Sequence, residues 1–382
     1  MSINNTHQTS STKKDLPEDV LMEILVKTEP KTVARCRCLS KQWYRQLSSY
    51  QFVKRNFFAT KGRHFSILLT FGFPPWEIGR DWLTSIHGES QATTPIRLPF
   101  NTSDFGWWSV IGCDNGLVCL RYSLHGLPSE IMLWNPLTRR TRILKDPGSV
   151  RSLHAVCIYN FGYTSGIDQY YVVHAYKRSF RDRRLEFTFY DSRMNDWTEH
   201  VIEDKVIQKL GPNSVWLNGV VFWINWVGED YIHPLCVVCY ELKSGQLNRY
   251  TIPKIAKKKF QYLSAFNDKV CYISYDSTCQ DDKIGIWKLD TNASRKKMWQ
   301  NILSINPISI GFNPNIFIGD QIIMLMEHRS NLMRINDRHN TEICLKSLNI
   351  KKNQSKELFY RTWMEEIEIK SLSLLLQGML NP

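Results

Sequence analysis

Residues 15–57 read DLPEDVLMEILVKTEPKTVARCRCLSKQWYRQLSSYQFVKRNF, and this stretch decides how the first part of the chain folds. Pro17 fits the first turn of a helix, because its missing N–H has no helical partner there. The apolar residues that follow, as far as Ile24, recur at helical spacing. Pro30 marks a second helix start, and Ser40 is a suitable N-cap for a third. The pattern predicts three short helices that bury little surface by themselves and therefore need a partner.

The same stretch resembles an F-box. The positions that carry the resemblance are Leu16, Pro17, Glu23, Ile24, Leu25, Arg35, Arg37, Leu39, Lys41 and Trp43. The resemblance implies docking on a Skp-type adaptor and, through it, on a cullin-based ubiquitin ligase. Together with the apolar spacing it indicates these adaptor-binding residues: Leu16, Pro17, Val20, Ile24, Leu25, Val33, Leu39 and Trp43. The alternative is an ordinary helical hairpin that packs on its own protein.

Three positions depart from the F-box pattern. Thr28 and Glu29 replace the usual apolar residue and proline before the second helix, and Cys36 replaces a larger apolar residue. Because we expect Glu29 to bury a charge near an apolar interface, we expect weaker adaptor binding than for a box with the usual residues.

From residue 62 onward the chain repeats itself about every fifty residues, a period typical of propeller-like arrays. One marker is a strand that follows a tight turn, at Asn115-Gly116, Asn218-Gly219, Asn267-Asp268 and Gly319-Asp320, with a looser copy at Gly166. The other marker is a strand that ends at Trp134, Tyr190, Tyr240, Trp287 or Ile335. Two markers with one period predict a mainly-β domain of six units, a six-unit β-propeller. A β-sandwich of two stacked sheets is the alternative.

This region resembles the F-box-associated domain of plant F-box proteins. The resemblance lies in residues 112–120, GCDNGLVCL, and 133–139, LWNPLTR, while no Gly-Gly pair of the kelch signature occurs. The fold class is therefore α+β and multidomain. The expected segments are a disordered tail at 1–14, the F-box at 15–57, the propeller-like domain at 62–365 and a C-terminal tail at 366–382.

Charge and cysteine content limit the possible partners. The net charge is +13, but the basic clusters are dispersed and no nucleic-acid-binding motif accompanies them, so we expect no nucleic-acid partner. The 10 cysteines include Cys236 and Cys239, which lie on an expected strand and face opposite ways. We therefore expect buried thiols, no metal site and no cofactor. We also expect no membrane partner and a cytoplasmic or nuclear location, since no signal peptide or membrane-spanning run is evident.

No known catalytic motif is present, so we expect no catalytic residues and a substrate receptor rather than an enzyme. In this interpretation the F-box binds the ligase and the β domain binds a protein target. Two alternatives remain open: a propeller enzyme of glycosidase type, and a binding module whose F-box no longer functions.

The expected target-binding surface lies on the loops that precede each aromatic-ended strand, at residues 122–130, 176–184, 225–234, 275–283 and 327–332. Equivalent loops of stacked repeats project from one face. Aromatic and arginine side chains are frequent interface anchors, which indicates Arg181, Arg183, Arg184, Trp226 and Tyr231. The alternative is that these residues are only solvated loop tips.

Overall fold

The computed structural model divides the chain into two compact units, Met1–Arg63 (unit 1) and His64–Pro382 (unit 2). The residues that the structure describes are 16–60, 65–72, 82–87, 93–96, 98–100, 105–124, 127–136, 139–148, 156–164, 169–179, 182–227, 233–253, 260–266, 268–275, 284–291, 298–305, 312–318, 321–329, 341–349, 354–363 and 368–376. The tail predicted at residues 1–14 lies outside them.

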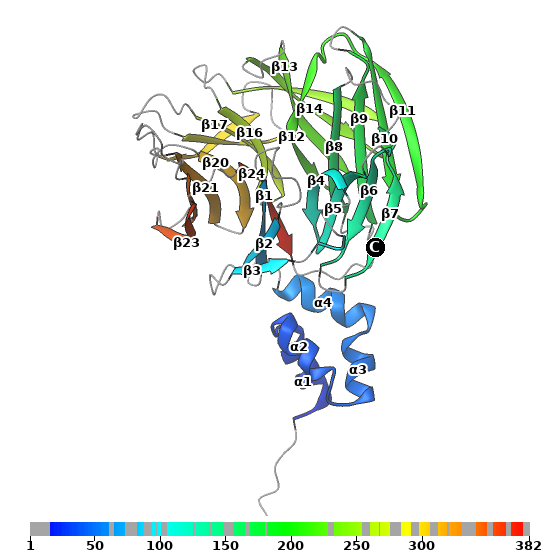
Figure 1. Cartoon of the computed structure of the whole chain (residues 1–382), viewed down its shortest axis with the longest axis vertical. Coiled ribbons are helices and arrows are strands. Elements are labelled where there is room, and N and C mark those ends of the chain that lie inside the picture. Colours follow the sequence, from blue (N-terminus) through cyan, green and yellow to red (C-terminus); the bar gives the residue numbers. More distant parts are fainter. Residues whose placement is uncertain are drawn as a thin grey trace, which may run out of the picture. The chain divides into compact units, whose positions relative to one another are not determined.

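The described residues of unit 1 form four helices, not the three that the sequence pattern predicts (Figure 1). They are α1 (Glu18–Val26), α2 (Pro30–Cys36), α3 (Lys41–Leu47) and α4 (Tyr50–Thr60). The prediction missed α4, whose start is capped by the Ser49 hydroxyl, which accepts the Phe52 N–H at 3.3 Å. Phe52 also joins the core of the unit, so α4 is held by burial as well as by its cap.

Polar side chains of α4 and of the segment after α2 close the ends of the other helices. The Asn56 amide donates to the carbonyl oxygens of Val26 and Thr28 at 2.9 and 2.8 Å, which satisfies the free end of α1. The Arg37 guanidinium donates to the Leu47 carbonyl at 2.8 Å at the end of α3. The carboxyl-terminal ends of α1 and α3 are therefore satisfied by side chains within unit 1.

Unit 2 consists, in its described residues, of six antiparallel sheets of four strands each. The strands are β1 (Phe65–Gly72), β2 (Trp82–His87), β3 (Thr93–Ile96), β4 (Phe105–Asp114), β5 (Leu117–Leu124), β6 (Glu130–Trp134), β7 (Thr141–Lys145), β8 (Val156–Thr164), β9 (Gln169–Lys177), β10 (Arg184–Asp191), β11 (Asp196–Glu203), β12 (Lys209–Leu217), β13 (Val220–Val227), β14 (His233–Glu241), β15 (Gln246–Thr251), β16 (Phe260–Phe266), β17 (Lys269–Tyr275), β18 (Ile284–Leu289), β19 (Trp299–Ile305), β20 (Phe312–Ile318), β21 (Gln321–Arg329), β22 (Thr341–Asn349), β23 (Gln354–Trp363) and β24 (Glu368–Leu376).

The two sequence markers have distinct places in these sheets. The tight turns join the first strand of a sheet to the second, and Asn115 and Gly116 adopt φ angles of 48° and 82°, which suit a two-residue hairpin. Asn218 and Gly219 repeat this geometry at 49° and 86°. The aromatic ends fall on third strands, such as Trp134 at the end of β6. Gly166, Asn267, Gly319, Asp320 and Ile335 lie outside the described residues.

One predicted segment is wrong. Residues 368–376, expected within a C-terminal tail, form β24, which pairs with β1 in the sheet ordered β24-β1-β2-β3. The pairing joins Phe65 to Leu376 and continues to Gly72 opposite Glu368. The prediction failed because β24 follows no tight turn of the repeat, and its partner strand is far away in the sequence.

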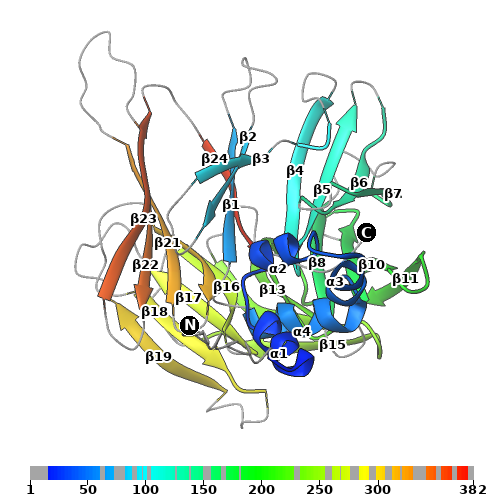
Figure 2. The same cartoon turned by 90° about the horizontal axis from the view of Figure 1, so that it is seen from below.

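The sheets follow one another in chain order through contacts between their edge strands β4, β8, β12, β16, β20 and β24, and β24 contacts β4. Figure 1 labels all six of these edge strands, and Figure 2 shows the sheets of unit 2 from below. The contact between β8 and β12 is close: a Cβ at Gly162 would lie 1.9 Å from Cγ of Trp216. The Trp216 indole N–H also donates to the Tyr163 carbonyl at 3.1 Å. Glycine at position 162 is therefore required by the indole beside it.

Removing residues 366–382 should destabilise unit 2 as a whole, because the first sheet loses the strand that pairs with β1. We expect its melting temperature to fall by about 10 °C or more, measured by circular dichroism in the β region. The matched control removes only residues 377–382 and leaves β24 intact. Equal melting temperatures for the two shortened chains would contradict a structural role for β24.

Candidate functional site

Unit 1 exposes a line of large apolar side chains. Leu16, Val20 and Ile24 (the α1 stripe) are 56%, 43% and 50% exposed. Val20 and Ile24 are four residues apart and therefore lie on one face of α1. Leu16 precedes Val20 by the same four residues and lies just before the start of the helix. The unit already has an internal core of Val26, among others. An apolar stripe that the core leaves uncovered is typical of a protein-binding surface.

The structure separates the predicted adaptor-binding residues into two groups. Leu16, Pro17, Val20, Ile24 and Leu39 are exposed. Leu25 and Trp43 are half-buried and pack against the core of unit 1, and Val33 is only 2% exposed.

Val33 is therefore a core residue in the free chain, and its assignment to the adaptor interface is wrong. Helical spacing shows which residues share a face, but it does not show which face turns inward. Tyr44, which the sequence prediction omitted, is 60% exposed on α3 and adds a further aromatic surface.

The departures from the F-box pattern are accommodated without a buried charge. Glu29 is exposed at the start of α2 in unit 1, and the burial of its carboxylate against an adaptor stays a prediction. The Thr28 hydroxyl donates to the Ile24 carbonyl at 2.7 Å, which satisfies its polar atom. Cys36 is half-buried against the core.

The predicted target-binding residues do not share one environment. Arg183 and Arg184 are exposed at the start of β10, where the Arg184 N–H donates to the Asp182 carboxylate at 3.0 Å. Arg181 and Tyr231 lie outside the described residues. Trp226 is only 5% exposed and belongs to a core cluster, so its assignment as a target anchor is wrong.

Trp226 is buried because β13 lies between neighbouring sheets. Six consecutive residues of β13, 221–226, are buried, so the strand is covered on both faces. A strand with one solvated face would alternate, and the sequence alone does not distinguish the two cases. Cys236 and Cys239 on the adjacent β14 are buried free thiols, as predicted.

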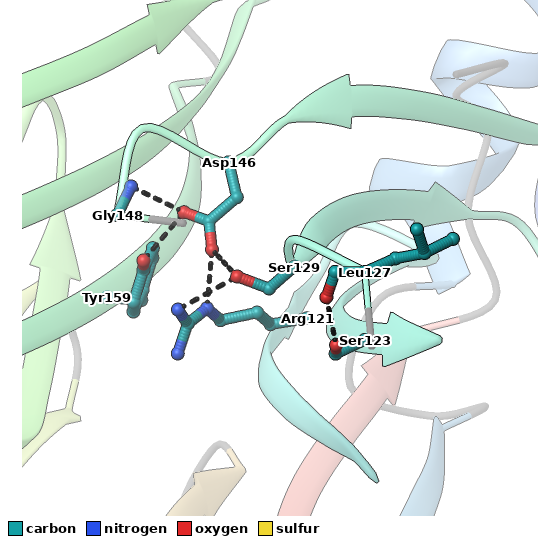
Figure 3. Close-up of polar contacts among 7 residues, drawn as sticks. All are labelled: Arg121, Ser123, Leu127, Ser129, Asp146, Gly148 and Tyr159. Atoms are coloured by element: carbon teal, nitrogen blue, oxygen red, sulfur yellow. Dashed lines mark hydrogen bonds and ion pairs between the residues drawn. The ribbon is translucent and has the colours of Figure 1, made fainter. Parts of the chain in front are cut away.

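A buried carboxylate fixes one of the predicted binding loops (Figure 3). Asp146, which follows β7, accepts hydrogen bonds from the Arg121 Nε–H at 2.7 Å, the Ser129 hydroxyl at 2.5 Å, the Gly148 N–H at 2.8 Å and the Tyr159 hydroxyl at 2.7 Å. Arg121 belongs to β5 and Tyr159 to β8, so the carboxylate links two successive sheets. The sequence gives no local signal for this network, because its members meet only in the fold.

The electrostatics of the network keep Asp146 ionised. Burial by itself raises the pKa of the Asp146 carboxyl, but the hydrogen bonds from Ser129 and Tyr159 and the charge of Arg121 outweigh burial, so the pKa is lowered. Burial and the adjacent Asp146 carboxylate raise the pKa of the Tyr159 hydroxyl, which therefore remains a donor. The Arg121 guanidinium also lies 4.7 Å from the centre of the Tyr159 ring.

The same network anchors the connection between β5 and β6. Ser129 fixes one end of the connection to Asp146, and the Ser123 hydroxyl donates to the Leu127 carbonyl at 2.8 Å near the other end (Figure 3). Leu127 is 57% exposed between these two fixed points. Leu127 therefore presents an apolar side chain while its carbonyl is held by Ser123.

Comparison with known families identifies both units. The pattern described as "F-box associated beta propeller domain" matches residues 83–367, and the F-box domain pattern matches residues 14–55. The chain belongs to the F-box-associated β-propeller family. An F-box/kelch-repeat protein of Arabidopsis thaliana is 21% identical over 84% of this chain and 88% of its own length. An F-box protein of the same organism is 22% identical over 86% of this chain and 87% of its own length.

Two further findings concern the described residues alone. They contain no helix that is both long and apolar enough to span a membrane. They also contain no group of three or more histidine, cysteine or acidic side chains arranged to hold a metal ion.

Asp146→Asn should destabilise unit 2 by about 3 kcal/mol at pH 7, because the largely buried Arg121 charge loses its partner. The lowered pKa means that Asp146 stabilises the fold above about pH 4, the unfolded value, and that this contribution disappears as the pH falls through the folded pKa. Urea unfolding of wild type and variant measures the difference in their free energy of unfolding at pH 7 and at pH 3. This difference in the free energy of unfolding should be smaller at pH 3 than at pH 7. The control, Asp196→Asn at an exposed position, should have little effect at either pH. An equal difference at both pH values would contradict an ionised Asp146.

Proposed function

We propose that this chain is the substrate-recognition subunit of an SCF-type ubiquitin ligase, a complex of a Skp-type adaptor, a cullin and an F-box protein. Unit 1 docks on the adaptor and unit 2 captures a protein target for ubiquitination. The observation that carries the proposal is the α1 stripe, whose large apolar side chains stay exposed although the unit has its own core. The F-box match over residues 14–55 gives this surface a partner of known type.

The mechanism is tethering rather than chemistry on this chain. A target bound to unit 2 is held near the ubiquitin-loaded enzyme of the ligase, which raises its effective concentration there. The chain forms and breaks no covalent bond. Its contribution is the geometry and affinity of two binding surfaces.

The six sheets of unit 2 are, in this proposal, the blades of a closed six-bladed propeller. Two observations support the closed ring: β24 completes the first sheet beside β1, and β24 also contacts β4 of the second sheet. In such a ring the connections between second and third strands of all blades lie at one end. Arg183 and the fixed β5–β6 connection with Leu127 then belong to one candidate target surface.

The enzyme alternative finds no support at the one buried carboxylate network described above. A glycosidase needs one carboxylic acid with a raised pKa and a second carboxylate facing it. Asp146 instead accepts four hydrogen bonds and has a lowered pKa, so it acts as a structural anchor.

The test is the affinity of the full chain for a Skp-type adaptor by titration calorimetry. Val20→Asp should weaken binding by about 2 kcal/mol or more, roughly 30-fold, because it places a carboxylate in an apolar interface. Val201→Asp is the matched control, since Val201 is 48% exposed on β11 and Val20 is 43% exposed on α1.

Both variants must retain the wild-type circular dichroism spectrum. Equal adaptor affinities of folded Val20→Asp and Val201→Asp would contradict docking through α1. A wild-type chain that does not bind any Skp-type adaptor would favour the alternative of a binding module whose F-box no longer functions.

A further inference from the structure

A cleft of about 300 Å³ opens between the fourth and fifth sheets of unit 2. The β12–β13 turn, with Leu217 and Asn218, lies on one side, and the β16–β17 turn, with Asp268 and Lys269, lies on the other. We call it the turn-end cleft. It lies at the opposite end of these strands from the connections in which target-binding residues were predicted, so it is a separate surface.

The interior of the turn-end cleft is apolar. Its walls include Val220 and Phe222 from β13, Val270 from β17 and Leu289 from β18. Phe222, Val270 and Leu289 are buried members of the core cluster between these sheets, so the cleft reaches down to the core. Its volume is at the lower limit of ordinary ligand pockets and suits a small ligand or one long side chain.

The mouth of the cleft carries the charges. Glu241 at the end of β14 and Asp268 in the β16–β17 turn supply two carboxylates, and Lys269 supplies one ammonium group. Within the described part of the chain, neither carboxylate forms an ion pair. The Glu241 carboxylate accepts a hydrogen bond from the exposed Ser244 hydroxyl at 2.7 Å. The two carboxylates and one ammonium group that line the cleft give a net charge of −1, in a chain whose net charge is +13.

The other polar groups of the cleft are neutral near pH 7. Burial, together with the adjacent Cys239 thiol, raises the pKa of Tyr250 to about 12. Burial raises the pKa of Cys239 to about 11, so this thiol is not a nucleophile at neutral pH. The cleft thus offers an apolar interior, an aromatic hydroxyl and a negatively charged mouth, which indicates binding rather than covalent chemistry.

We propose that the turn-end cleft receives a lysine or arginine side chain of the protein target, with its aliphatic stem along Val220 and its cationic head facing Glu241 and Asp268. The proposal rests on the proposed function of unit 2 as the target-capturing unit. Val220 lies directly opposite Glu241 in the β13–β14 pairing, so an apolar side chain and a carboxylate are neighbours at the mouth, which suits a long basic side chain with an apolar stem and a charged end. Screening over about 8 Å at physiological salt lets these nearby carboxylates outweigh the positive charge elsewhere on the chain.

The test titrates the full chain with Nα-acetyl-lysine methylamide and with the uncharged isostere Nα-acetyl-norleucine methylamide, followed by ligand-observed NMR. The Glu241→Gln, Asp268→Asn double variant removes both carboxylates with little change of shape. Asn suits position 268, where φ is 55°, because its side chain tolerates the left-handed region of the backbone. The matched control is Asp196→Asn, Glu199→Gln, two exposed carboxylates on β11.

We expect wild type and control to bind the lysine derivative more tightly than the norleucine derivative. The double variant should bind the lysine derivative about fivefold more weakly, a loss of the size expected for two partly exposed ion pairs. Lys269→Gln should instead bind it about twofold more tightly, because it removes a repelling charge. A general loss of stability would weaken binding in both variants, so it does not explain weaker binding by the double variant together with tighter binding by Lys269→Gln.

Equal binding of the two derivatives to wild type, or an equal effect of the double variant and its control, would overturn the proposal. Binding of n-pentylamine as tight as that of the lysine derivative would assign the cleft to free alkylamines instead and would equally overturn it. Adaptor affinity measured on the same preparations tests the proposed function separately, since no residue of the cleft belongs to unit 1.

Discussion

The pairing of β24 with β1 is the constraint on which unit 2 depends most. A four-stranded sheet with two apolar faces is not stable alone, and each sheet here buries its faces against its neighbours. The first sheet takes three strands from the start of the unit and one from its end, in register from Phe65–Leu376 to Gly72–Glu368. The two ends of the unit therefore have to meet before the first sheet and its contact with β4 can form.

The two units differ in how completely they bury their apolar side chains, and the proposed function rests on this difference. Unit 2 covers β13 on both faces and surrounds its internal carboxylate, Asp146, with four donors. Unit 1 buries Val33 and Leu47 and satisfies the carboxyl-terminal ends of α1 and α3, but it leaves the α1 stripe uncovered. Exposed apolar surface on a small folded unit is explained by a partner that covers it.

Much of this organisation follows from local sequence signals. Helix starts at Pro17 and Ser40, and hairpin turns at Asn115-Gly116 and Asn218-Gly219, depend on neighbouring residues only, so the sequence predicts them. The Ser40 hydroxyl does accept the Trp43 N–H, at 3.1 Å. The repeat of these turns also predicts a mainly-β region, which the family match describes as a β-propeller domain.

The remaining features depend on residues that are far apart in the chain. Helical spacing and the F-box resemblance assign Val33 to a binding surface, and residue type assigns Trp226, but packing partners from other segments bury both. β24 is a strand because β1 lies beside it, and Asp146 is an anchor because β5 and β8 bring donors to it. Residue type and local spacing do not contain this information.

Amide hydrogen exchange of the full chain with and without a Skp-type adaptor tests the central claim most directly. The account predicts slower exchange in α1 and around Leu39 and Tyr44 when the adaptor is bound, since these segments carry the exposed apolar side chains of unit 1. It also predicts no change in the strands of unit 2. Protection by the adaptor that falls on the strands of unit 2 and leaves α1 unchanged would contradict the account.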